Sequence, residues 1–302
     1  MANAFDTVAV DVIAQEALTR LIQKLDFVKG IHKNFSTTAL ALNQNVITHI
    51  LTEMNATDVV LADGYIDSAN DAVQSDVSIT LDQHKAVTFT LSDAERDASS
   101  IDLFNRFAEV AAYGLAKGIV DELLGANTLG IGGASISANN VQAGGLSMDA
   151  LIDLGALFDA NGVPESQRWL VAHPQVLADL EREVTAVTNS TFSVNSSIVE
   201  GGVNRIRGFN CYSYNGGILT TTAGSVGAIA GFSDSLAIVT APPSSPPSSA
   251  GADLSYVTDP STGLTIQRRQ WYDADTGTYA FALTLYLGTK LTSGDRIYGI
   301  QN

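Results

Sequence analysis

The chain has 302 residues, and its 16 lysines and arginines are outnumbered by 32 aspartates and glutamates, which gives a formal net charge of −16. Hydrophobic residues make up 45% of the sequence, enough for a globular protein with a substantial core. Phosphate backbones bind clustered cations, whereas the basic residues here form only isolated pairs, at Arg205 and Arg207 and at Arg268 and Arg269. The composition therefore argues against tight nucleic-acid binding.

Two further features concern the compartment in which the protein works. The first residues contain no basic stretch followed by a hydrophobic run, so we expect no signal peptide, and the longest apolar runs are too short to span a membrane. Cys211 is the only cysteine, which excludes a disulfide within the chain and fits a reducing compartment. We interpret this cysteine as a small buried apolar residue.

The N-terminal third predicts a helix and a β-hairpin. Apolar residues recur at helical spacing within residues 11–27, and residues 43–51 are consistent with a strand. Residues 77–81 and 87–91 alternate between apolar and polar, with residues 82–85 between them as a turn, and this pattern predicts a hairpin. A lone hairpin is only marginally stable in water, so we expect this one to pack on another surface.

A long helix is predicted directly after the hairpin. Ser92 and Glu95 have the spacing of a capping box, and helical periodicity continues from Ile101 to Gly125. Gly114 and Gly118 lie one turn apart, which allows either the close approach of another backbone or a kink. The apolar positions of this helix are Leu103, Phe104, Phe107, Val110, Ala111, Leu115, Ile119 and Leu123.

The middle of the chain predicts an irregular segment and then alternating helices and strands. Residues 126–146 are rich in small and polar residues and predict a loop. A helix capped by Ser147 follows and ends by Gly162; we expect it to bury Leu151, Leu154, Leu157 and Phe158. Residues 169–172 form an apolar run suited to a central strand, and the next helix begins at Pro174.

The last third predicts mainly strands. Successive strands are expected between Asn204 and Thr240, and the Pro- and Ser-rich residues 241–250 predict an exposed loop. Two further strands flank residues 273–277, which have the composition of a hairpin turn. These strands and a final one comprise residues 264–271, 278–287 and 296–300.

No pattern in the sequence indicates catalysis or metal binding. The histidines lack the spacing of metal ligands; they are His32, His49, His84 and His173. Asp273 and Asp275 are similar to the start of a calcium loop whose distal glutamate is missing, and residues 130–133 lack the lysine of a phosphate loop. We therefore predict no enzymatic activity, no cofactor, and no catalytic, cofactor-binding or metal-binding residues.

Several segments, in their order along the chain and their pattern of apolar and polar residues, resemble the major capsid (coat) protein of tailed bacteriophages. That protein has the HK97-like fold, and the resemblance is in particular to its P22-coat-like branch. The segments that carry the resemblance are residues 11–18, 87–95, 101–125, 162–174, 203–209 and 279–295. The implied fold is α+β. Its implied parts are an N-terminal arm (1–35), an extended loop or E-loop region (36–92), a peripheral domain with a long spine helix (93–146), an axial or A-domain (147–260) and strands that return to the peripheral domain (261–302).

The resemblance also implies a function. Such a protein self-assembles as hexamers and pentamers into an icosahedral shell that encloses double-stranded DNA, without sequence-specific binding and without a membrane. The implied partners are other copies of the chain, a separate scaffolding protein and a portal protein, with a decoration protein as a further candidate. The implied location is the virion, after assembly in the cytoplasm of a bacterial host.

The resemblance implies that the hairpin takes part in assembly. We expect the hairpin to lie over the next protomer, so that aspartate at Phe89 or Leu91 would spare subunit folding and block assembly. Some family members crosslink a lysine to an asparagine, but no partner is evident for Lys85 near the hairpin tip, and no crosslink is inferred.

The alternative functions are an encapsulin-like protein compartment and a phage tail or adhesin β-protein; the long helix argues against the tail or adhesin protein.

Overall fold

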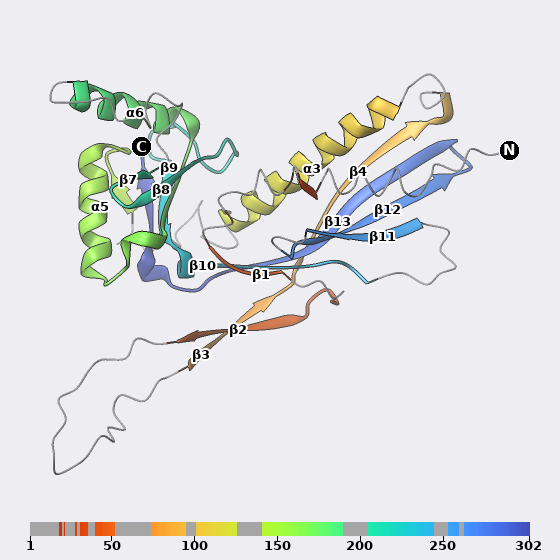
Figure 1. Cartoon of the computed structure of the whole chain (residues 1–302), viewed down its shortest axis with the longest axis horizontal. Coiled ribbons are helices and arrows are strands. Elements are labelled where there is room, and N and C mark those ends of the chain that lie inside the picture. Colours follow the sequence, from red (N-terminus) through yellow and green to blue (C-terminus); the bar gives the residue numbers. More distant parts are fainter. Residues whose placement is uncertain are drawn as a thin grey trace, which may run out of the picture.

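The computed structural model describes residues 31–35, 40–51, 74–94, 101–125, 141–189, 205–244, 253–259 and 263–302, with positions 18, 19, 21 and 28. This part is a mixed α+β structure with two six-stranded sheets, a two-stranded ribbon and few helices (Figure 1). The elements are β1 (His32–Phe35), β2 (Asn45–Leu51), β3 (Gln74–Thr80), β4 (Gln83–Ser92), α3 (Ile101–Leu123), β5 (Val141–Ala143), α5 (Met148–Ala160), β6 (Arg168–Ala172), α6 (Pro174–Asn189), β7 (Arg205–Ile206), β8 (Phe209–Ser213), β9 (Val226–Phe232), β10 (Leu236–Ala241), β11 (Asp253–Thr258), β12 (Thr265–Asp273), β13 (Thr278–Leu291) and β14 (Ile297–Gln301). The predicted α+β class is confirmed.

The first sheet is built around the long strand β13. Tyr286 pairs with His84 of β4 and with Ala241 of β10, so β4 and β10 lie on opposite edges of β13. Strand β12 pairs with β13 farther along the edge that β10 uses, and β11 and β1 extend the sheet beyond β12 and β10. Strand β4 has no other strand partner in the described sheet and therefore forms its edge.

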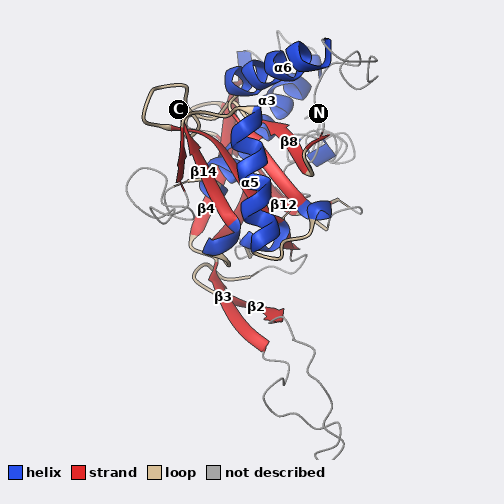
Figure 2. Ribbon diagram, turned by 90° about the vertical axis from the view of Figure 1, so that its left-hand side faces the viewer, coloured by secondary structure: helices blue, strands red, loops and turns tan. Residues whose placement is uncertain are grey.

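The second sheet has the strand order β5-β14-β9-β6-β8-β7 and contains the last strand of the chain. Helices α5 and α6 pack on one face of it, where their apolar side chains meet Leu170 and Ala172 of β6 (Figures 1 and 2). Trp169 and Val171 alternate with these residues and point to the opposite face. Every residue of β6 is buried, as expected for a strand covered on both sides.

One continuous core joins the two sheets. Leu115, Ile119 and Leu123 of α3 are buried together with Phe281 of the first sheet and Trp169 of the second. Helix α3 lies along β4 and β13 in Figure 1, with its apolar stripe facing that core. The two sheets therefore share hydrophobic burial and do not form separate cores.

Several local predictions are confirmed. The backbone N–H of Ala150 donates to Oγ of Ser147 at 3.1 Å, which caps α5, and Gly162 follows that helix in the left-handed region at φ 67°. Helix α6 begins at Pro174, and the residue 273–277 turn joins β12 to β13. The sequence was sufficient for these caps and this turn because each depends on residues close together in the chain.

The predicted hairpin of residues 77–91 is wrong. Strand β3 pairs with β2, whereas β4 pairs with β13, almost two hundred residues away in sequence. Only Leu81 and Asp82 separate β3 from β4, so the chain passes in extended form from the ribbon into the first sheet. Alternation identified both strands correctly, but it carries no information about which strand each one joins.

The predicted buried face of the long helix is also partly wrong. Val110 was expected in the core, yet its side chain is 67% exposed. Small residues that were not expected there, Ala112 and Ala116, are buried instead. The helix is thus rotated relative to the predicted stripe, so that Ala112 and Ala116 enter the core and Val110 faces outward.

Some predictions concern residues outside the described part. These are most of the helix at residues 11–27, Glu95 of the capping box, the loop at 126–140 and the end of the Pro- and Ser-rich segment at 245–250. Leu18 and Leu21 are described; both are helical and both are buried in the shared core. None of the described helices combines the length and the hydropathy that a membrane span requires.

Replacing Gly231 with alanine should destabilise the subunit by about 1–3 kcal/mol, because overpacking a fixed core site has that cost. A Cβ at Gly231 would lie 2.3 Å from Cζ2 of Trp169, and the indole is held by a 3.0 Å hydrogen bond from its Nε1 to the carbonyl oxygen of Phe232. Urea unfolding of the subunit measures the change. Gly217→Ala is the matched control, since nothing lies within 4 Å of its Cβ; equal stability of both variants would contradict the packing argument.

Candidate assembly surfaces

The described residues contain no cluster of three or more histidines, cysteines, aspartates or glutamates placed to hold a metal ion. Cys211 is partly buried, and this burial raises the pKa of its thiol to about 11. Because the thiolate is the nucleophilic form, Cys211 is unreactive near neutral pH. The side chain packs beside the core under α5 and α6, in agreement with the apolar role expected for it.

Two of the histidines, His84 and His173, have structural contacts. Nε2 of His84 lies 2.6 Å from Oγ1 of Thr284, and the His84 ring meets the ring of Tyr286 edge-on. Burial, followed by the positive charge of Arg269, lowers the pKa of His84, so its neutral form is favoured. Nδ1 of His173 accepts a hydrogen bond from the backbone N–H of Gln175, as expected for a residue at the start of a helix.

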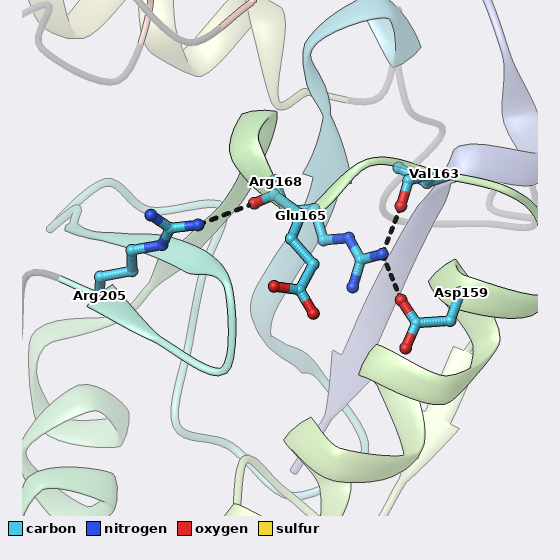
Figure 3. A network of polar contacts seen from close by, with 5 residues as sticks. All are labelled: Asp159, Val163, Glu165, Arg168 and Arg205. Carbon is cyan, nitrogen blue, oxygen red and sulfur yellow. Dashed lines mark hydrogen bonds and ion pairs between the residues drawn. The ribbon is translucent and has the colours of Figure 1, made fainter.

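The basic pairs are used within the fold. Arg268 is buried and donates to Oγ of Ser255 at 2.8 Å and to Oδ2 of Asp253 at 3.0 Å. Arg205 donates to the carbonyl oxygen of Glu165 at 3.1 Å (Figure 3). These contacts tie neighbouring strands and turns together, and they leave Arg268 unavailable to a phosphate backbone.

A buried arginine fixes α5 to the second sheet. Nη2 of Arg168, at the start of β6, donates to Oδ1 of Asp159 at 2.6 Å and to the carbonyl oxygen of Val163 (Figure 3). Its guanidinium also lies 5.4 Å from the ring centroid of Phe158. The group joins the end of α5 to the sheet that α5 covers, which is a structural role.

Helix α3 is bound tightly to the edge strand β4. Nζ of Lys85 lies 2.7 Å from Oε2 of Glu122 on the helix, and both side chains are largely buried. The ring of Phe89 meets that of Phe281 with centroids 5.0 Å apart, and Leu91 is buried. The expectation that Phe89 and Leu91 lie over a neighbouring protomer is therefore wrong, because both residues complete the core of their own subunit.

The ribbon of β2 and β3 is attached to the body by a small separate core. Ile79 and Leu81 are buried against residues of β10 such as Val239. Gly288 of β13 lies directly under β3, where a Cβ would come 2.4 Å from the carbonyl oxygen of Thr80. Nζ of Lys290 donates to the carbonyl oxygen of Ser78 at 2.8 Å. The base of the ribbon is thus held by apolar and polar contacts.

Beyond this base the ribbon projects away from the body of the subunit, as both Figure 1 and Figure 2 show. Ile47 is 56% exposed, although it is a large apolar side chain in a strand. A two-stranded ribbon is only marginally stable on its own. The projecting part of the ribbon is therefore a candidate surface for contact with another molecule.

Two helices expose further apolar side chains. Val110 and Tyr113 lie one turn apart on α3, and both are exposed. On α5, Ile152 and Leu157 are exposed; Leu157 was expected to be buried, but it lies on the helix face directed away from the sheet. Val110 and Tyr113 share one face of α3 and are therefore a further candidate for an interaction surface, whereas Ile152 and Leu157 lie on different sides of α5.

Comparison with known proteins identifies the fold. No protein-family model and no curated protein matches the sequence. Among solved structures, the capsid of the cyanophage P-SCSP1u superimposes with a TM-score of 0.56 at 12% sequence identity, covering 89% of this chain and 86% of that one. The chain shares the fold of phage capsid structures.

Two other solved capsid structures also match the fold of this chain. The mature capsid of bacteriophage PhiM1 matches with a TM-score of 0.54 at 10% identity over 89% of this chain and 85% of that one. The capsid of an empty GTA particle matches with a TM-score of 0.54 at 12% identity over 92% and 89%. The capsid fold therefore spans both sheets, and the likeness lies in the structure and hardly in the sequence.

Replacing Phe89 with aspartate should lower the free energy of unfolding of the subunit by about 2–3 kcal/mol, because its partly buried ring packs on the main core and deleting even a fully buried phenylalanine costs about 3–5 kcal/mol. Thr88→Asp is the control, since Thr88 is exposed on the other face of the same strand and a surface change of this kind stays within about 0.5 kcal/mol. Urea unfolding measures the free energy of unfolding of both variants. A Phe89→Asp subunit as stable as wild type would show that the packing of β4 on β13 is dispensable.

Gly288→Ala should detach the base of the ribbon or strain it by about 1–3 kcal/mol, because backbone atoms of β3 occupy the space of the new methyl group. Faster hydrogen exchange in β3 and faster proteolysis of the ribbon would report this. Gly118→Ala in α3 serves as the control: its Cβ meets nothing within 4 Å, and alanine in a helix gains up to about 1 kcal/mol over glycine. Unchanged exchange in β3 of the Gly288→Ala variant would contradict the expected clash.

Proposed function

We propose that the protein is the major capsid protein of a tailed phage, a structural subunit that assembles as hexamers and pentamers into an icosahedral shell around double-stranded DNA. The observation that carries this proposal is the capsid fold, which extends over about nine-tenths of this chain and of the chains it resembles. The proposed role is structural and not enzymatic.

The surface of the subunit supports assembly. The ribbon projects from the body, and apolar side chains are exposed on three separate elements, at Ile47, Val110 and Leu157. The two-stranded ribbon is marginally stable alone, so contact with a neighbour would stabilise it. Neighbours on several sides would bury these side chains, as a closed shell requires.

We also propose how the parts of the subunit correspond to those of an HK97-like capsid protein. Residues 1–35 would be the N-terminal arm, 36–92 the E-loop region, 93–146 the peripheral domain with α3 as spine helix, 147–260 the A-domain, and 261–302 the return to the peripheral domain. The burial of Phe281 of β13 in one core with Leu115 of α3 supports the last correspondence, while β14 pairs in the second sheet. The finer assignment to the P22-coat-like branch rests on the sequence segments that resemble it.

The charge balance supports a shell that encloses DNA without binding its sequence. A subunit with a net charge of −16 repels a phosphate backbone on average.

The proposed partners, beyond other copies of the chain, are a separate scaffolding protein, a portal protein and a decoration protein. Assembly would take place in the cytoplasm of a bacterial host, and the final location would be the virion. We also propose that the inner wall is acidic, so that packaged DNA does not adhere to it.

Purified protein should form closed shells tens of nanometres across, visible by negative-stain electron microscopy. Because the subunits are strongly acidic, raising the ionic strength from about 0.01 M to about 0.15 M shortens the Debye length from about 30 Å to about 8 Å and should increase the yield. Co-expression of the adjacent phage genes provides the control for a missing scaffold. Tubes would favour a tail protein, shells that retain an enzyme would favour an encapsulin-like compartment, and small particles under all conditions would contradict assembly.

A further inference from the structure

Two asparagines in the chain are followed directly by glycine, Asn161 before Gly162 and Asn215 before Gly216. Such a pair is chemically labile, because glycine has no side chain to keep its backbone nitrogen away from the carboxamide carbon of the preceding asparagine. Attack by that nitrogen closes a succinimide ring and expels the side-chain amide as ammonia. Whether the reaction occurs in a folded protein therefore depends on how firmly the fold holds the carboxamide and the glycine N–H.

The fold holds Asn161 in both respects. Nδ2 of Asn161 donates to the hydroxyl oxygen of Tyr298 at 2.9 Å, and Tyr298 is buried. The N–H of Gly162 donates to the carbonyl oxygen of Asp159 at 3.1 Å, so the pair closes the last turn of α5. Attack would require the carboxamide to leave Tyr298 and the N–H of Gly162 to leave Asp159.

Asn215 is not held in this way. It lies in the loop that follows β8, and it is exposed. No described residue forms a hydrogen bond with the carboxamide of Asn215 or with the backbone N–H of Gly216. Gly217 is exposed as well, and nothing lies within 4 Å of a Cβ built there. This segment can therefore adopt the conformation that attack requires without breaking a hydrogen bond to the described part of the fold.

The glycine that makes this pair labile is required by packing. A Cβ at the buried Gly216 would overlap Cε1 of Tyr214, whose ring covers the glycine. The ring is held in place, because the hydroxyl of Tyr214 donates to Oδ1 of Asp121 at 2.6 Å and to the carbonyl oxygen of Lys117 at 3.3 Å. Any larger residue at position 216 would displace this ring, so the packing favours glycine directly after Asn215.

The same tyrosine joins the second sheet to the long helix. Tyr214 directly follows β8 of the second sheet, whereas Asp121 belongs to α3. Burial, followed by the hydrogen bond to Asp121, raises the pKa of Tyr214, so its hydroxyl stays protonated and remains a donor. A chemical change at Asn215 would therefore act one residue away from a contact between the two parts of the subunit.

We propose that Asn215 deamidates spontaneously in the folded protein, whereas Asn161 does not, and that the product loosens the contact of Tyr214 with α3. The nitrogen of Gly216 bonds to Cγ of Asn215, the bond from Cγ to Nδ2 breaks, and ammonia leaves with the proton of the glycine N–H. One water then opens the ring to aspartate or isoaspartate. Both products place a new negative charge next to the residue that binds Asp121, and isoaspartate also adds one carbon to the backbone.

Mass spectrometry of the purified protein tests the reaction. The folded protein is kept at mildly alkaline pH in water enriched in heavy oxygen, and samples are digested at intervals. The peptide that contains Asn215 should gain the mass of an amide-to-acid conversion with one heavy oxygen. Because two hydrogen bonds oppose attack at Asn161, its peptide should convert at least about tenfold more slowly. No conversion at Asn215, or equal rates at the two positions, would overturn the proposal.

Unfolded protein provides the control for local sequence. In concentrated urea the hydrogen bonds of Asn161 are lost, so both asparagines should convert at similar rates. If Asn161 stayed slow in urea, its flanking residues and not the fold would protect it, and the structural argument would fail. Asn215→Ser keeps the glycine that Tyr214 requires and should abolish the mass change in its peptide.

Hydrogen exchange tests the effect on α3. Protein in which Asn215 has converted should exchange faster near Asp121 than fresh protein, and Tyr214→Phe, which lacks the donor, should show the same change without deamidation. Asn215→Ser, incubated in parallel, should keep the slow exchange of fresh protein. Unchanged exchange in the converted protein or in Tyr214→Phe would overturn the loosening of α3. The inference does not depend on the shell function, and its failure would leave that function standing.

Discussion

The structure depends on the burial of α3 against two sheets at once. Leu115 and Ile119 lie in a core that also contains Phe281 from the first sheet and Trp169 from the second. Each sheet would expose an apolar face without this helix, and at about 25 cal/mol per Å² such a face is the largest favourable contribution available to it. The helix therefore sets the relation between the sheets and, through β4, the direction in which the ribbon leaves the body.

Because the main core is complete within one subunit, the surfaces left for assembly are those that cannot be covered from inside. The ribbon projects beyond its small anchoring core, and the outward edge of β4 has no strand beside it among the described elements. Glycines mark the places where backbones must lie closest: Gly288 under the ribbon and Gly231 under Trp169. A rigid body with a well-anchored extension is suited to repeated contacts with identical neighbours.

The sequence predicted most elements of the fold and a good part of their boundaries. Alternation identified β4, the turn composition of residues 273–277 located β12 and β13, helical periodicity identified α3 and α5, and the cap at Ser147 located the start of α5. It did not predict the partner of β4 or the orientation of Val110. Strand pairing and helix orientation are fixed by contacts between segments far apart in the chain, which a local pattern does not contain. The open edge of β4 was missed for the same reason, although its lack of outward charge was already visible.

The sequence by itself determined the acidic charge, the single cysteine, the order of most helices and strands and, through their pattern of apolar and polar residues, the resemblance to capsid proteins. Only the tertiary structure decided that residues 77–92 are two strands of different sheets, that Phe89 belongs to the core of its own subunit, and that β4 is left with an open edge. The physical reason is the range of the interactions. Caps, turns and periodicity act over a few residues, whereas the pairing of β4 with β13 joins segments that only the folded chain brings together.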